Sequence, residues 1–134
     1  MRLFTTQEAN DALPLVRPLV ERVVRRRREL QSVERRLKVV RASVSGNGGS
    51  LDPARVTDLS EQAARLTAEL ARLVDEIHAI GVQVKDLDVG LIDFPAAHPR
   101  SGETVCLCWR LGEEEIAHWH GVDEGFAGRK PLPF

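Results

Sequence analysis

The feature that most constrains the fold is an unbroken heptad pattern downstream of Pro53. Apolar residues recur there at alternating steps of three and four, at Val56, Leu59, Ala63, Leu66, Leu70, Leu73, Ile77 and Ile80. This spacing places one apolar stripe along a single helix, as in coiled coils. Asp52 suits the N-cap, Pro53 suits the first helical position, and Gly81 suits the C-terminal stop. The segment predicts one long helix that must bury its stripe against a partner.

A second apolar stripe with similar spacing lies upstream of this helix. Its members are Leu13, Val16, Val20, Val23, Leu30, Val33, Leu37, Val40 and Val44, with Arg27 at one seam position. The Gly- and Ser-rich residues 45–50 predict a turn between the two stripes. Because the connection is short, we expect the two long helices to be antiparallel neighbours.

Two prolines interrupt the beginning of the first helical segment. The capping-box pattern of Thr5 and Glu8 predicts a helix start near residue 6. Proline inside a helix removes a hydrogen bond and clashes with the preceding turn. We therefore expect a short first helix ending near Ala12, a second helix opening at Pro14, and a kink at Pro18.

The net charge of −1 conceals a strong asymmetry along the chain. Residues 1–44 carry 11 Lys/Arg and 5 Asp/Glu, a net of +6, so residues 45–134 carry the remaining 8 and 15, a net of −7. A basic helix beside a more acidic one accounts for this asymmetry. The off-seam residues Val24, Val39 and Val74 widen an apolar stripe that an isolated hairpin would leave partly open. We therefore predict a homo-oligomer, or cover from the C-terminal region or another protein.

The periodicity changes from helical to alternating after Gly81. Short strands are predicted from Val82 to Lys85, from Gly90 to a stop at Pro95, from Glu103 to Leu111, and from Glu115 to His120, with residues 121–134 irregular.

These patterns predict an α+β fold in a single domain, residues 1–134. A long, coiled-coil-like antiparallel helical hairpin occupies residues 6–81. A small antiparallel β-sheet of three or four strands and a C-terminal loop occupy residues 82–134 and pack on the open end of the hairpin.

Composition excludes several classes of protein. No apolar run approaches the roughly 20 residues of a membrane span, and the N-terminus lacks the features of a signal peptide. Two cysteines spaced C-x-C form no disulfide framework. We expect a cytoplasmic protein with reduced thiols and no membrane partner.

Two cysteines and two histidines occupy shared faces of neighbouring predicted strands. Cys106 and Cys108 lie on one face of their strand, and His118 and His120 lie on one face of the next. Two thiolates and two imidazoles would suit tetrahedral Zn²⁺.

The register of these strands decides whether the four side chains converge. A three-residue loop, residues 112–114, places Cys108 opposite His118 and Cys106 opposite His120. A loop of two or four residues puts the two pairs on opposite faces. Glycine at the first loop position suits a two-residue type II′ turn, and C-x-C spacing is unusual for zinc. We therefore expect no cofactor and buried cysteines, with structural zinc as an alternative.

Polar residues also gather around the glycine-containing residues 125–128. His120, Asp123, Arg129 and Lys130 surround this turn, whose backbone N–H groups could hold an anion. Thiol chemistry at Cys108 is a further alternative, because Arg110 lies two residues away on the same strand face and could lower the pKa of the thiol.

Asp93 offers a carboxylate to this region. It could orient His120 as a general base or pair with Arg129. We favour a simpler interpretation, an ion pair between Arg129 and Asp123 that locks the C-terminal loop. The candidate binding residues are Asp93, Trp109, Arg110, His120, Asp123 and Arg129.

The first long helix is rich in basic residues. Its cations are Arg22, Arg25, Arg26, Arg27, Arg28, Arg35, Arg36, Lys38 and Arg41. Glu21, Glu29 and Glu34 interrupt them, and the aromatic residues are not interleaved with basic ones as in a stacking platform. Nucleic acid is therefore not the expected partner.

The opening FTTQEANDALPLVRPL and the runs GLIDFP, CWRLGE and WH-x-x-D-x-GFAGRKP span nearly the whole chain. Together they resemble a bacterial family of unknown function, the domain-of-unknown-function family numbered 2203. The resemblance implies a complete, free-standing protein and implies no activity. The matching residues are Glu8, Asn10, Pro14, Lys85, Asp93, Phe94, Pro95, Cys108, Trp109, Arg110, His120, Asp123, Phe126, Gly128 and Arg129, whereas Cys106 and His118 lie outside the pattern.

The leading prediction is a non-catalytic cytosolic scaffold or protein-interaction module that self-associates through its helices. The first alternative is a metal-binding or small enzymatic module centred on Cys108, His120, Asp123 and Arg129. The second is nucleic-acid binding by the basic first helix.

Overall fold

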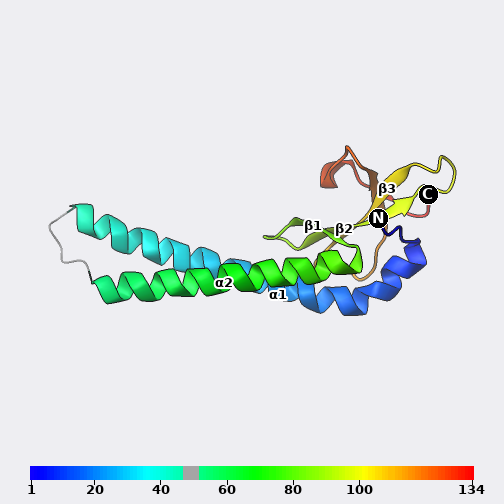
Figure 1. Ribbon diagram of the computed structural model, residues 1–134. Helices are drawn as coiled ribbons and strands as arrows, with labels where there is room; N and C mark the ends of the chain where they lie inside the picture. The colour runs from blue at the N-terminus through cyan, green and yellow to red at the C-terminus, as the bar shows by residue number, and fades with distance from the viewer. Residues whose placement is uncertain (47–51) are drawn as a thin grey trace.

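The computed structural model describes residues 1–46 and 52–134 of the chain. The turn expected over residues 45–50 falls largely outside these ranges, as does the side chain of Val44. The elements are α1 (Thr6–Gly46), α2 (Pro53–Ile80), β1 (Gln83–Asp86), β2 (Leu91–Ala97), β3 (Thr104–Arg110), β4 (His118–Gly121), the 3₁₀ turn η1 (Phe126–Gly128) and β5 (Lys130–Pro131). The two helices lie side by side and the sheet packs on their open end (Figure 1), which confirms the α+β prediction.

Helix α1 is continuous over 41 residues, so the prediction of a short first helix ending near Ala12 was wrong. Both Pro14 and Pro18 lie inside it. Its first turns bend away from the axis of the rest (Figure 1), which is the expected effect of proline on a helix. The bend brings these turns onto the sheet, where Ala9 is fully buried and the Asn10 Oδ1 atom accepts a 2.8 Å hydrogen bond from the backbone of Ile116. This packing keeps the helix intact despite the lost hydrogen bonds.

Helix α2 begins and ends where its capping residues predict. The Asp52 side chain accepts hydrogen bonds from two backbone N–H groups of the first turn, and Gly81 takes the left-handed conformation at φ 101°. The heptad residues Leu59, Leu70, Leu73 and Ile77 are buried. The predicted seam is therefore confirmed.

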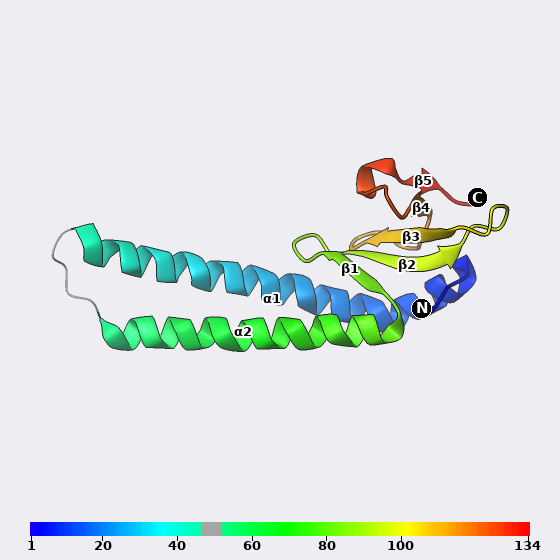
Figure 2. The same ribbon diagram turned by 45° about the horizontal axis from the view of Figure 1, so that its top comes forward.

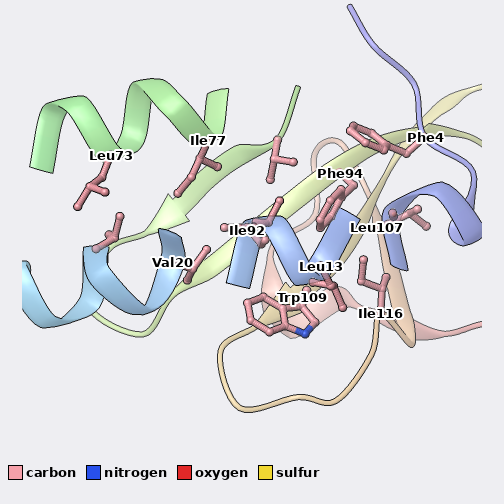
Figure 3. Packing of buried hydrophobic residues seen from close by; sticks show 14 of the residues in the cluster. Phe4, Leu13, Val20, Leu73, Ile77, Ile92, Phe94, Leu107, Trp109 and Ile116 are labelled. Carbon is pink, nitrogen blue, oxygen red and sulfur yellow. The ribbon is translucent and has the colours of Figure 1, made fainter. Parts of the chain in front are cut away.

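The main core lies between the open end of the hairpin and one face of the sheet (Figure 3). A second, smaller cluster of Val33, Leu37 and Leu59 lies further along the hairpin. There the helices project past the sheet as an arm, here defined as residues 25–42 of α1 and the part of α2 beside them (Figure 2).

The sheet accounts for part of the apolar surface that suggested self-association. Val24 is only 4% exposed, and the β1–β2 turn at Gly90 packs against it. Val74 is half-buried, whereas Val39 remains 67% exposed. Self-association through the helices stays a prediction.

The sheet has five strands in the order β1-β2-β3-β4-β5, rather than the three or four predicted. All paired neighbours are antiparallel. The fifth strand and η1 lie in the segment that was expected to be irregular. Strand β2 continues through Pro95 to Ala97 because β1 pairs with β2 only as far as Asp93. Beyond that point a proline without an N–H is tolerated on the open side, where its carbonyl accepts a 2.7 Å hydrogen bond from Phe4.

The register between β3 and β4 places Cys108 opposite His118 and Cys106 opposite His120. This is the converging register, so the preference drawn from the turn chemistry of Gly112 was wrong. Strand β4 begins at His118 rather than at residue 115, and the connection is longer than a tight turn. The Glu113 N–H donates to the carbonyl of Arg110 at 3.0 Å, and the Glu113 side chain accepts from the Arg110 N–H at 2.7 Å, so Glu113 holds this connection.

Among the helices of residues 1–46 and 52–80, none combines the length and the apolar character needed to cross a membrane.

Candidate metal centre

The two faces of the sheet differ in chemistry. Leu107 and Trp109 of β3 point toward the hairpin and are fully buried (Figure 3). The alternating residues of β3, Cys106 and Cys108, point to the opposite face because successive strand residues alternate. The C-terminal segment lies on that side of the sheet, away from the helices (Figure 2). It helps to bury a face that would otherwise be open to water.

Two side chains from the strands that flank β3 meet above that strand. Asp93 pairs with Cys108 in the β2–β3 ladder, and His120 pairs with Cys106 in the β3–β4 ladder. The His120 Nε2 atom lies 3.1 Å from the Asp93 Oδ1 atom. Ligand-type atoms of Asp93, Cys108 and His120 all lie within 4.8 Å of one another, and the three residues are 1%, 1% and 4% exposed.

The hydrogen bonds of His120 define the state of its ring. Its Nδ1 atom lies 2.8 Å from the carbonyl oxygen of Gly121, which can only accept a hydrogen bond. With Nδ1 donating to this carbonyl, Nε2 is the ring nitrogen that faces the carboxylate oxygen of Asp93. Its distance from this oxygen is that of a hydrogen bond.

Both cysteines are poor nucleophiles in this environment. Burial raises the pKa of the Cys106 thiol to about 11, and the negative charge of Asp93 and a hydrogen bond to it act in the same direction. Burial also raises the pKa of the Cys108 thiol to about 11, against a hydrogen bond from Arg129. Without a metal ion, both thiols stay protonated at neutral pH.

Arg129 supplies the cation nearest to Cys108, in place of the predicted Arg110. Its Nη1 atom lies 3.9 Å from the Cys108 Sγ atom. The same guanidinium makes two hydrogen bonds, of 3.0 and 2.6 Å, to the carboxylate of Glu113. The interpretation of an Arg129–Asp123 ion pair was therefore wrong, because Glu113 takes the guanidinium. Arg110 is exposed and lies over the ring of Phe126.

His118 lies outside the cluster although the register places it opposite Cys108. Its Nδ1 atom is buried, has no hydrogen-bond partner among the described residues, and lies 3.7 Å from the Glu113 Oε2 atom. Of the four predicted zinc ligands, Cys108 and His120 come together, Cys106 lies beside them, and His118 turns to Glu113. Asp93 takes the position that His118 was expected to fill.

The other candidate binding residues do not join this group. Trp109 belongs to the core and donates from Nε1 to the carbonyl of Glu113 at 3.1 Å. Asp123 is exposed, and Lys130 pairs with Glu124 at 2.8 Å. The predicted anion pocket around residues 125–128 is therefore not assembled from these side chains.

Glu113 is the residue that the sequence did not reveal. Burial raises the pKa of its carboxyl, but hydrogen bonds from Arg129 and from the backbone of Arg110 outweigh burial, so that the pKa is lowered overall. Its side chain accepts from the Arg110 N–H at 2.7 Å, which anchors the β3–β4 connection. The sequence marks Glu113 as the partner of Arg129 only once the strand register is known.

The donor set fits a transition metal. Zinc is bound by cysteine sulfur, histidine nitrogen and carboxylate oxygen, and ligating histidines commonly donate their second N–H to a backbone carbonyl. Asp93, Cys108 and His120 supply these three donors, and the Gly121 carbonyl supplies that outer hydrogen bond.

A family model matches residues 2–132 of the chain, and its description reads uncharacterized conserved protein, DUF2203. No curated protein and no solved structure matches the chain.

Proposed function

The chain belongs to the DUF2203 family, and we propose that it binds one zinc ion through Asp93, Cys108 and His120. The observation that carries this proposal is the convergence of a carboxylate oxygen, a thiol sulfur and an imidazole nitrogen within 4.8 Å of one another in a buried site. These are three of the donor types that zinc binds.

The spacing of the donors suits zinc. Zinc–ligand bonds of 2.0–2.3 Å place the ligands of a tetrahedral site roughly 3.3–3.8 Å apart. The three donor atoms lie within 4.8 Å of one another, so small side-chain rotations suffice to close around an ion. Bound zinc would deprotonate the Cys108 thiol, whose pKa is high in the metal-free site because burial disfavours the thiolate.

Cys106 is the natural fourth ligand. It precedes Cys108 by two residues on the same face of β3, and it pairs with His120 in the β3–β4 ladder. A complete set of Asp93, Cys106, Cys108 and His120 would tie β2, β3 and β4 together. His118 is not part of this set, because its Nδ1 atom lies beside Glu113.

The burial of the site favours a structural role. Its three central residues are at most 4% exposed, which leaves little room for a substrate or an exchanging water. Closed, fully coordinated zinc sites are structural, whereas catalytic ones keep an open position. Arg129 would balance the charge of the metal-bound thiolate through its contact with Cys108 Sγ.

The test is the zinc affinity of the chelator-treated, full-length protein. Titration against a chromophoric chelator should give about one bound zinc per chain. Cobalt in place of zinc should produce the charge-transfer absorption of a thiolate–metal bond. Cys108→Ser and His120→Ala should lose this binding. His118→Ala is the matched control, since it removes a neighbouring imidazole outside the cluster and should bind zinc normally.

Two results would overturn the proposal. One is a wild-type protein that binds no zinc or cobalt at micromolar concentrations while its circular dichroism shows the native fold. The other is equal loss of binding in His118→Ala and His120→Ala. If His120→Ala does not fold, Asp93→Asn serves instead, because it keeps the shape of the side chain and removes the charge.

A further inference from the structure

We propose that the outward face of α1 along the arm binds the phosphate backbone of duplex DNA, independently of the metal centre. Four exposed basic residues on the side of α1 opposite its seam carry this interaction: Arg25, Arg28, Arg35 and Lys38. Arg36 instead lines the groove between the helices with Glu69, and Arg41 lies one turn from Leu37 on the seam side.

These four cations make no ion pair within the part of the chain that the structure describes. Three other α1 arginines of this region do make one. Arg22 and Arg26 bind Glu69 of α2, and Arg27 binds Asp88 of the β1–β2 turn. The available acidic groups are thus used by the arginines nearest the seam. The outward face keeps its positive charge.

The glutamates that interrupt the basic run do not neutralise this face. Glu29 is held by Arg26 in a 2.8 Å ion pair. Glu21 is half-buried and lies beside the β3–β4 connection, with Arg17 and Leu111. Glu34 is the one exposed carboxylate among the cations of the arm that makes no ion pair with the described residues. The negative charge that interrupts the basic residues in the sequence is therefore smaller on this face of the folded protein.

The length and rigidity of the face suit a duplex. From residue 25 to residue 38 the helix rises about 20 Å at 1.5 Å per residue. This length spans about six base pairs of 3.4 Å rise along the duplex axis. Packing against α2 through Val33, Leu37 and Leu59 holds this part of α1 as a helix, so that the spacing of its backbone positions is set before binding.

Other occupants fit this face less well. A helix that lies on a membrane inserts an apolar face, but Val33 and Leu37 point toward α2, and Val39 is exposed alone. A second copy would have to offer an acidic surface. The outward face of its α2 carries both signs, three arginines against four acidic residues: Arg55, Asp58, Glu61, Arg65, Arg72, Asp75 and Glu76. DNA presents a much denser negative charge.

The experiment measures fluorescence anisotropy of a labelled 30-base-pair duplex of mixed sequence with the full-length protein. The wild type should bind, with an affinity that falls as salt rises. Replacing Arg25, Arg28 and Arg35 by glutamine should weaken binding by at least about tenfold and reduce the salt slope by about three. The matched control replaces Arg55, Arg65 and Arg72 of α2 by glutamine and should bind like the wild type.

Three outcomes would overturn the proposal. They are no binding at low salt, binding that does not respond to salt, and equal loss of binding in the α1 and α2 variants. Binding to anionic vesicles without binding to DNA would also overturn it, in favour of a membrane surface. Circular dichroism and thermal unfolding of both variants show whether the hairpin stays intact.

Discussion

Asp93 and His120 illustrate how a single buried pair limits the chemistry of a site. Both side chains are at most 5% exposed, and His120 Nε2 lies 3.1 Å from Asp93 Oδ1. Removing one partner leaves a buried polar group unsatisfied and costs about 1–3 kcal/mol. The pair holds β2 and β4 together across β3.

Glu113 gives the protein a dependence on acid that can be measured. Hydrogen bonds from Arg129 and Arg110 lower its pKa below the ordinary 4.5, although burial opposes this shift. A carboxyl whose pKa is lower in the folded state stabilises the protein above its unfolded pKa, and this contribution is lost as the pH falls through 4.5 and below. We expect the free energy of unfolding to fall less in Glu113→Gln than in the wild type between about pH 6 and about pH 3.

Chemical denaturation across this pH range measures the difference. Glu115→Gln is the control, because that side chain lies on the same connection and is exposed. Parallel pH profiles for Glu113→Gln and the wild type would contradict the assignment of Glu113 as the anchor of Arg129.

At the level of elements, the β1–β2 turn is the point where the sheet closes on α1. Gly90 there has φ +69°, and a Cβ atom at this position would lie 2.8 Å from Leu111 Cβ and 2.9 Å from Val20 Cγ1. No other residue fits both the backbone and the space. The close approach lets the turn cover Val24, which the hairpin alone would leave open.

Gly90→Ala should therefore lower the free energy of unfolding by about 2–4 kcal/mol, through a strained backbone and overpacking. Gly102→Ala is the matched control, because Gly102 has φ +74° but no atom within 4 Å of the added Cβ. It should lose only about 1 kcal/mol, from the backbone alone. Urea denaturation measures both values. Equal losses would show that packing against α1 contributes little.

In the whole molecule, the buried apolar contacts fall into two regions. One is the body, defined as the sheet and the part of the hairpin that it covers, and the other is the arm. The body encloses the main core, with Trp109 and Phe94 fully buried. Beyond Leu30, the described residues of the arm have the smaller Val33–Leu37–Leu59 cluster and its flanking residues. Segments with few buried apolar contacts open at lower free energy than the core.

Native-state hydrogen exchange should show this division. Amides around residues 33–40 and 56–63 should exchange faster than those of β3 and the α1 segment beneath it. Leu37→Ala should destabilise the arm by about 2 kcal/mol and leave β3 unaffected. Leu73→Ala, in the main core, should increase exchange in both regions. Uniform protection in the wild type would mean that the arm and the body unfold together.

Much of the fold was predictable because the patterns that define it are local. The heptad stripe, the capping residues Asp52 and Gly81, and the alternation of β3 each follow from a few neighbouring residues. The prediction of a helix break near Ala12 was wrong because proline locally favours a break, whereas packing of this helix on the sheet favours a continuous helix. The site was predictable in part: Cys108, His120 and Asp93 were all candidates, but their combination was not.

The sequence by itself determined two helices, their facing stripes, an alternating C-terminal region, and the face of each strand on which its polar residues lie. Periodicity settles these features, since a side chain's direction depends on its nearest neighbours along the chain. Only the tertiary structure decided the β3–β4 register, the meeting of Asp93 with His120, and the choice of Glu113 as the partner of Arg129. These contacts join residues distant in sequence, where packing energies exceed the small preferences of a single turn.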